Sequence, residues 1–141
     1  MADVERKRVV RGIVIDDEGR ILMGTRPQSK NFAGLWELPG GIIQGCETSH
    51  GSIEREIKAK TNLDVEDLMF LGEYIDEKTV EGVVYYVSYF RIYPRDLNQF
   101  KHVDKNRNPE WDWFPLSNMP REENIFGEIP LNKVRFYAKV V

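Results

Sequence analysis

The sequence has little of what disulfide-bonded, zinc-bound or membrane-spanning proteins need. Its one cysteine, Cys46, cannot form an intrachain disulfide, and a single thiol is typical of a reducing compartment. The two histidines, His50 and His102, are too few and too far apart for a zinc site with Cys46. No apolar run approaches the roughly 18 residues that cross a bilayer, and the charged N-terminal segment lacks the apolar part of a secretory signal. We therefore expect a soluble cytoplasmic domain with no membrane partner.

A surplus of positive charge is also absent, since 20 Lys and Arg face 23 Asp and Glu and the formal net charge is −3. Binding to duplex DNA or RNA through bulk electrostatics favours a strongly basic face. We therefore expect no duplex nucleic acid partner, although a local basic pocket for phosphates stays open. The 141 residues, 41% of them hydrophobic, can build one core, and we expect a single domain over residues 1–141.

Local patterns predict strands followed by helices rather than a regular alternation of the two. Segments rich in β-branched and aromatic residues predict strands at 9–15, 20–25, 68–74, 83–93 and 110–116. The turn-forming residues 16–19 join the first two strands as a hairpin. Thr48 is the expected N-cap of a helix that runs to about Thr61 and stops at Asn62, and a second helix is expected at 131–141. Such an order predicts an α/β sandwich with a mixed sheet and helices packed on it.

One segment carries a pattern with fixed spacing. The pattern places a glycine, a glutamate, an Arg-Glu-aliphatic triplet and a later aliphatic residue at Gly41, Glu47, Arg55, Glu56, Ile57 and Leu63. This segment resembles the Nudix box, and the preceding residues 34–41 resemble the lead-in of MutT-type members. The resemblance covers roughly residues 8 to 140. It implies the fold class α/β, as a Nudix-type α/β/α sandwich with a mixed β-sheet.

The resemblance also implies a reaction. Nudix members cleave the pyrophosphate of nucleoside triphosphates or other nucleoside diphosphate derivatives with Mg²⁺ or Mn²⁺, and they are often homodimers. The chemistry suits the segment, because glycines let the backbone approach a phosphate and a helix N-terminus favours anions. Carboxylates at i, i+3 and i+4 share one helix face, where they can hold divalent cations that activate a water.

The helix departs from the family pattern at three positions. Ala59 and Lys60 stand where the family has two acidic residues, and Asn62 stands where it has glycine. An ammonium about 4 Å from a divalent cation would be repelled by about 8 kcal/mol at an effective dielectric near 20. The usual cluster of two or three metals therefore cannot be built from this helix alone.

By resemblance, the remaining box residues take the metal and catalytic roles. Glu56 would bind the metal, with help from a backbone carbonyl near Gly41, and Arg55 would pair with Glu47 to brace the loop on the helix. Asp104 is the candidate for a carboxylate from elsewhere, since the family often supplies a ligand from that region. The alternative for Glu56 is an exposed surface pair with Lys60 at i+4.

Candidate substrate contacts are Arg26, Gly40, Gly41, Lys60 and Asn124. The family resemblance would put Arg26 on the substrate and Asn124 on a base edge. Their alternatives are a charged residue at a strand end and a loop asparagine that caps a turn. Lys60 is either a phosphate contact or a solvated lysine.

Three readings of the whole chain follow. The first is weak hydrolysis through one metal held by Glu56 and a further carboxylate. The second is a catalytically inactive nucleotide-binding or interaction module, in which Lys60 supplies part of the missing metal charge. The third is the branch resembling GDP-mannose hydrolases, which has alanine where Ala59 stands but keeps an acidic residue where this chain has Lys60.

Overall fold

The chain folds into two β-sheets and two α-helices in the computed structural model, which describes residues 3–101, 108–126 and 131–139. The four-stranded sheet has the spatial order β4 (Gly40–Ile42), β1 (Glu5–Val14), β6 (Val83–Pro94) and β5 (Val65–Asp76). β1 runs parallel to β6, and the other neighbours are antiparallel, so this sheet is mixed. The second sheet is antiparallel, with the order β3 (Trp36–Glu37), β2 (Ile21–Thr25) and β7 (Trp111–Phe114). Short 3-10 turns lie at Leu97–Gln99, Leu116–Asn118 and Glu122–Asn124.

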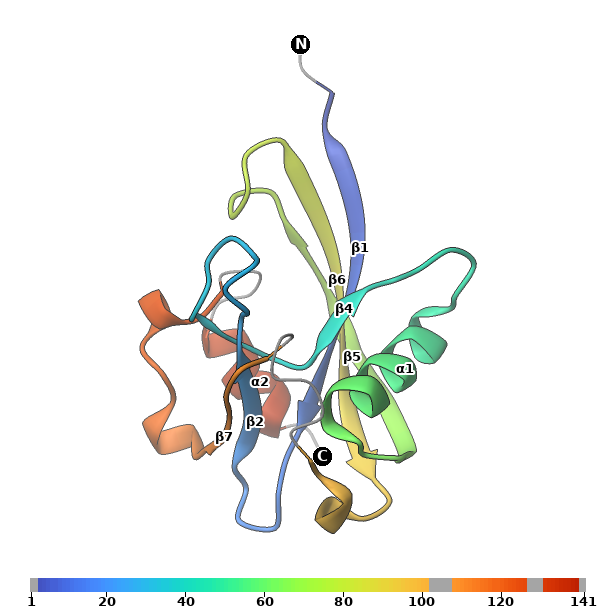
Figure 1. Ribbon diagram of the computed structural model, residues 1–141, viewed down its shortest axis with the longest axis vertical. Coiled ribbons are helices and arrows are strands. Elements are labelled where there is room, and N and C mark those ends of the chain that lie inside the picture. Colours follow the sequence, from blue (N-terminus) through green and yellow to red (C-terminus); the bar gives the residue numbers. More distant parts are fainter. Residues whose placement is uncertain (1–2, 102–107, 127–130, 140–141) are drawn as a thin grey trace.

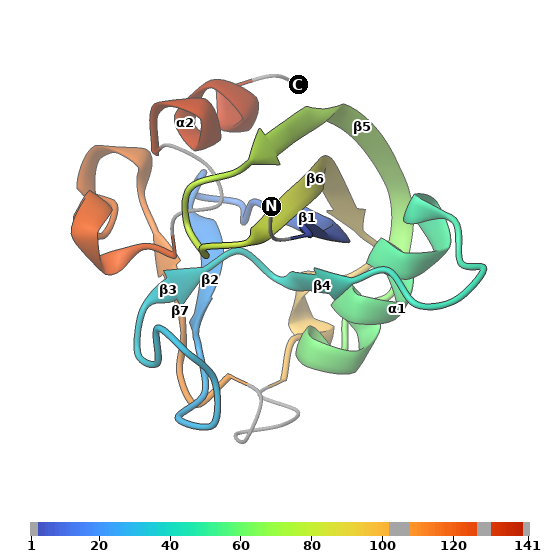
Figure 2. The ribbon, with the colours of Figure 1, turned by 90° about the horizontal axis from the view of Figure 1, so that it is seen from above.

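The helices α1 (Ser49–Thr61) and α2 (Leu131–Lys139) lie on opposite sides of the strands (Figures 1 and 2). Neighbouring residues on β1 reach these two sides in turn, because side chains alternate along a strand. Val9 packs in the apolar cluster that contains Val134 of α2, and Val10 packs in the cluster that contains Ile57 of α1. The expected α/β/α sandwich with a mixed sheet is confirmed. Neither helix is long and apolar enough to cross a bilayer.

The predicted hairpin of the first two strands is wrong. Asp16 does organise the turn, since its side chain accepts hydrogen bonds from the backbone N–H groups of Glu18 and Arg20. Beyond the turn, however, only Ile15 and Ile21 form a bridge, and β1 and β2 then join different sheets. Both strands are buried along most of their length, and each pairs over several residues with a strand of its own sheet, β1 with β6 and β2 with β7.

The first helix has the boundaries that its capping residues predict. The Thr48 side chain accepts a hydrogen bond from Gly51 N at 3.0 Å, and Asn62 adopts φ 63° at the C-cap. The inward face of α1 carries Ser52, Ile53, Glu56, Ile57 and Thr61. Because Glu56 lies on this buried face, the helix places a carboxylate under strand β4. The second helix is described from Leu131 to Lys139, and the last two residues predicted for it lie outside the described part.

Replacing Gly51 with alanine is expected to stabilise the chain. Gly51 is an exposed first-turn residue of α1, and glycine in a helix costs about 0.5 to 1 kcal/mol relative to alanine. The added Cβ would lie 3.3 Å from Thr48 Oγ1, close but within reach of a small side-chain adjustment. Urea denaturation should show a free energy of unfolding higher by about 0.5 kcal/mol. A lower value would mean that the methyl group displaces the Thr48 cap.

Candidate active site

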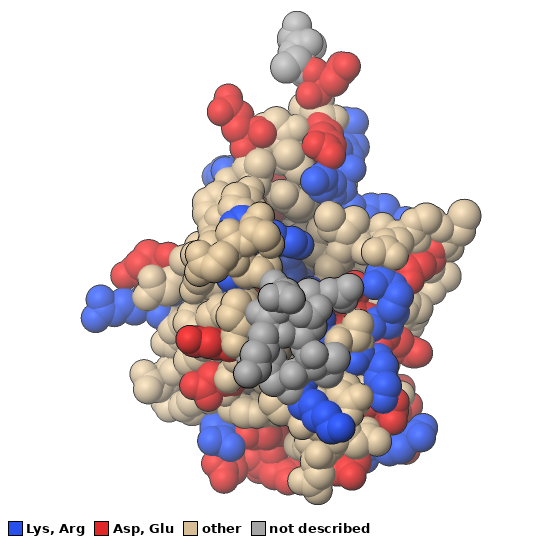
Figure 3. Space-filling model, viewed as in Figure 1, with Lys and Arg blue, Asp and Glu red and all other residues tan. Residues whose placement is uncertain are grey.

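A cleft of about 360 Å³ opens between the loop after β2, strand β4 and helix α1. The charged side chains that line it are Lys30, Glu37, Arg55, Glu56 and Lys60. Lys and Arg side chains show in the recess between the loop after β2 and strand β4 in the space-filling view (Figure 3). The cleft is therefore a polar site that suits an anionic ligand.

Arg55 joins the loop before α1 to the helix itself. Its Nε donates to Glu47 Oε2 at 2.6 Å, and its Nη2 donates to Glu47 Oε1 at 3.0 Å. Glu47 Oε1 also accepts from Gln44 N at 2.9 Å, which closes the loop. The Arg55 hydrogen bond lowers the pKa of the Glu47 carboxyl, and the backbone bond from Gln44 acts in the same direction. The two residues expected to pair are thus brought together.

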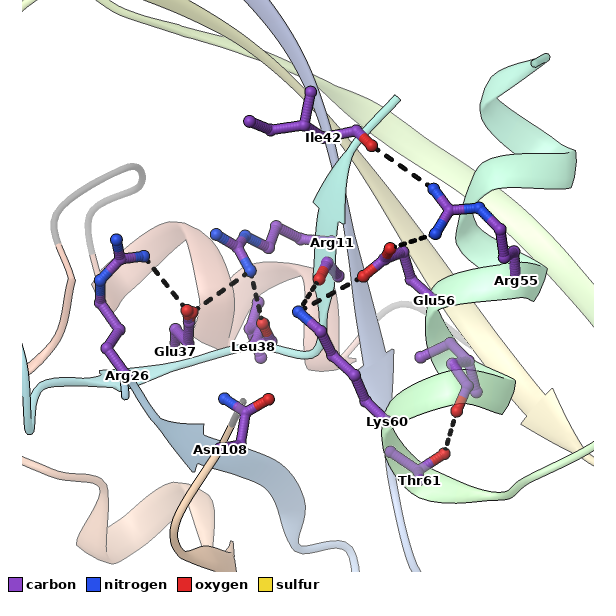
Figure 4. Close-up of polar contacts among 12 residues, drawn as sticks. Arg11, Arg26, Glu37, Leu38, Ile42, Arg55, Glu56, Lys60, Thr61 and Asn108 are labelled. Atoms are coloured by element: carbon purple, nitrogen blue, oxygen red, sulfur yellow. Dashed lines mark hydrogen bonds and ion pairs between the residues drawn. The ribbon is translucent and has the colours of Figure 1, made fainter. Parts of the chain in front are cut away.

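Glu56 lies at the floor of the cleft and is only 6% exposed. Its Oε1 accepts from Arg55 Nη1 at 2.5 Å, and its Oε2 lies 3.3 Å from Lys60 Nζ (Figure 4). The i+4 pair with Lys60 is therefore real, but it is buried rather than a surface pair. Gly41 leaves room for this carboxylate, because a Cβ there would lie 2.5 Å from Glu56 Oε2.

Lys60 points into the site and is not a solvated lysine. Its side chain is 14% exposed, and its ammonium donates a hydrogen bond to the carbonyl oxygen of Gly40 (Figure 4). Burial lowers the pKa of Lys60, and the nearby Arg11 guanidinium lowers it further, whereas Glu37 and Glu56 raise it. The ammonium is thus held between a strand carbonyl and a helix carboxylate.

Two buried charges were not predicted, Glu37 in the lining of the cleft and Arg11 beside it. Arg11 Nη1 donates to the Leu38 carbonyl at 2.9 Å and lies 3.6 Å from Glu37 Oε2. Glu37 Oε1 accepts from Arg26 Nη1 at 3.2 Å, so one carboxylate lies between two guanidinium groups (Figure 4). The sequence did contain a signal for this pair, because Arg11 is a single arginine inside the β-branched run 9–15. A charge in a buried strand needs a partner of opposite charge.

The remaining candidate contacts lie apart from the cleft floor. Arg26 is buried, donates to Asn31, and stacks 3.9 Å from the Phe126 ring centre, so Arg26 orders the loop after β2. Asn124 is exposed at the end of a 3-10 turn, next to the buried Ile125. Asp104 lies outside the described residues.

The described donors do not fit the metal cluster that the family implies. No three His, Cys, Asp or Glu side chains among the described residues come together closely enough to hold a cation. Glu56 is the only carboxylate that α1 presents to the cleft, and both of its oxygens already contact cationic side chains. Among the described residues, the cleft therefore pairs its one helix carboxylate with two cationic side chains, Arg55 and Lys60.

Comparison with known proteins gives the same family as the box. The family model described as the NUDIX domain matches residues 5–132. A MutT-like protein of Streptomyces ambofaciens is 35% identical over 85 residues, 60% of this chain and 50% of that protein. An 8-oxo-dGTP diphosphatase of Proteus vulgaris is 28% identical over 65 residues, 46% of this chain and 58% of that protein. The chain thus spans about half the length of these two curated relatives.

The fold is shared with solved members of the family. The crystal structure of a MutT NUDIX hydrolase from Burkholderia pseudomallei superposes with a TM-score of 0.75 at 20% identity, covering 97% of this chain and 98% of that one. At this identity the likeness concerns the fold alone. The family match, however, spans nearly the whole described structure, including β4, α1 and the cleft between them. This chain therefore belongs to the NUDIX domain family, among its MutT-like members.

Proposed function

We propose that this chain binds a nucleoside triphosphate or another nucleoside diphosphate derivative in the cleft and cleaves its pyrophosphate bond slowly. The observation that carries the proposal is the buried Glu56 carboxylate on the cleft floor, held between Arg55 and Lys60 and below Gly41. Family membership supports the reaction type, and the basic lining supports a phosphate ligand.

Each box residue has a distinct part in this proposal. Arg55 and Glu47 are positioning residues that brace the loop against α1. Gly40 and Gly41 keep the β4 backbone close to the ligand, and Lys60 contacts a phosphate oxygen. Arg26 supports the wall of the cleft through Asn31. For Asn124, contact with the base edge rests on the family resemblance alone.

Magnesium or manganese is the cofactor that the family implies. The His, Cys, Asp and Glu side chains of the described residues do not form a cluster that fits it. Such an ion, when bound, supplies charge that neutralises phosphates and activates water. Glu56, the carbonyl near Gly41 and Asp104 are the residues proposed to hold it, and the shortage of carboxylates is the reason for slow turnover.

Replacing Glu56 with glutamine is expected to lower metal-dependent turnover by a factor of at least about 100. The neutral amide lacks the negative charge of the carboxylate that would bind the cation. Purified protein is assayed with magnesium and manganese against nucleoside triphosphates, nucleotide sugars, ADP-ribose and dinucleoside polyphosphates. Released phosphate or pyrophosphate is the readout. The matched control is Glu54→Gln on the exposed face of the same helix, which should leave turnover unchanged. Turnover by Glu56→Gln at the rate of the natural sequence contradicts the assignment.

A second candidate function is a nucleotide-binding module that has lost the reaction. The contact of Lys60 with Glu56 and Gly40 favours it, because this ammonium occupies oxygens that a cation would need. The same panel separates the two functions. A ligand that raises the melting temperature while no product appears identifies the module.

The homodimer and the cytoplasmic compartment are part of the proposal as well. The homodimer rests on the family resemblance alone. The compartment rests on the single thiol of Cys46, which is free and exposed.

A further inference from the structure

The Lys60 ammonium lies where two oxygens from different elements converge. One is the Gly40 carbonyl of strand β4, and the other is Glu56 Oε2 of helix α1, at 3.3 Å. A carboxylate and a backbone carbonyl are the kind of oxygen pair that hard divalent cations select. Here a side chain of the protein itself brings the positive charge to that pair.

The two occupants compete for the same oxygens. Glu56 Oε1 is bonded to Arg55 and Glu56 Oε2 contacts Lys60, so a divalent cation at this carboxylate would compete with these two cationic side chains. Ala59, at i+3 from Glu56, offers a methyl group and no replacement oxygen. Charge repulsion between the ammonium and a divalent cation acts in the same direction.

The ammonium also faces the ligand. Gly40 and Glu56 take two of its three hydrogens, and Lys60 lines the cleft, so the third can be donated to a phosphate oxygen. Arg55 and Lys30 line the same cleft and add positive charge for further oxygens of a pyrophosphate.

We infer that the Lys60 ammonium replaces a divalent cation in this cleft and gives it a metal-independent affinity for the pyrophosphate group of its ligand. The inference rests on the proposed function for the nature of the ligand. It separates binding from turnover, because binding depends on the Lys60 ammonium, whereas turnover depends on a divalent cation taken up from solution. Magnesium therefore does not strengthen binding.

Isothermal titration calorimetry with inorganic pyrophosphate tests the inference. The full chain is first stripped with EDTA and then titrated with and without millimolar magnesium. We expect binding in EDTA that magnesium does not strengthen. Lys60→Gln should raise the Kd in EDTA at least about tenfold, which corresponds to about 1.4 kcal/mol. Lys60→Arg keeps the charge and should restore part of the affinity.

Lys58→Gln is the matched control, since Lys58 lies on the same helix with a half-exposed side chain that pairs with Asp64 outside the cleft. It should bind like the natural sequence. Binding that appears only with magnesium, or binding by Lys60→Gln at full strength, overturns the inference and leaves the proposed function standing. If neither pyrophosphate nor any nucleotide of the panel binds, with or without magnesium, both fail together.

Discussion

The double variant Ala59→Glu/Lys60→Glu is expected to cleave nucleoside triphosphates in magnesium at least about tenfold faster than the natural sequence, a barrier lower by about 1.4 kcal/mol. Positions 56, 59 and 60 share one helix face, because side chains at i, i+3 and i+4 lie together. Glu56 already points to the cleft floor, and Lys60 lines the same cleft. Three carboxylates there would offer the oxygen ligands that magnesium prefers.

The control for this variant carries the same change of charge on the same helix. Ala59→Glu/Lys58→Glu replaces the partly exposed Lys58, which lies outside the cleft, and should show less than half of the gain. Circular dichroism must show that both variants keep the fold, since added carboxylates repel one another without metal. Equal rates for the natural sequence and the double variant would mean that the site has diverged beyond the box.

Replacing Gly40 with alanine is expected to destabilise the chain by about 3 kcal/mol, the upper end for overpacking. A Cβ on Gly40 would lie 1.9 Å from the Val10 carbonyl oxygen and 3.0 Å from Arg11 Cα. These are backbone atoms of β1, which cannot rotate away as a side chain does. Strand β4 would have to separate from β1 at the pair Arg11–Gly40, and Lys60 would lose its carbonyl partner. The melting temperature should fall by about 10 °C.

Gly45→Ala in the loop after β4 is the control for this loss. Gly45 has φ 51°, but a Cβ there would meet no atom within 4 Å. The control therefore measures the cost of a left-handed alanine, about 1 to 2 kcal/mol, without a steric clash. If Gly40→Ala lowers the free energy of unfolding no more than Gly45→Ala does, β4 can shift away from β1 at little cost.

Several features of the site followed from the sequence because neighbours along the chain produce them. The family resemblance implied that Arg55 pairs with Glu47, and the structure brings these two side chains together. The contact of Arg55 with Glu56 was not predicted. The helix begins after Thr48 and stops at Asn62, as predicted. Both caps form hydrogen bonds with residues three or four positions away, Thr48 with Gly51 and Asn62 with Lys58.

Other features were not predicted, or were predicted wrongly, because long-range pairing decides them. Strands β3 and β4 are too short to carry a pattern, and they exist because β2 and β1 offer edges to pair with. The hairpin prediction was wrong for the same reason. The turn brings Ile15 and Ile21 together, but it does not decide which sheets the two strands join. Alternation along β1 also predicts that Arg11 shares a side with Val9, but not that Glu37 is its partner.

By itself, the sequence indicated the family, the helix that carries the box, and the presence of Ala59 and Lys60 where the family resemblance implies acidic residues. The residue types and their spacing are enough to predict these features, because each feature depends on residues that are near one another in the sequence. Only the tertiary structure decided where the replacement points. The ammonium of Lys60 meets a carbonyl 20 residues away in sequence, in a strand that pairs with β1. Such a contact depends on how a helix and a sheet pack, and no local pattern encodes that geometry.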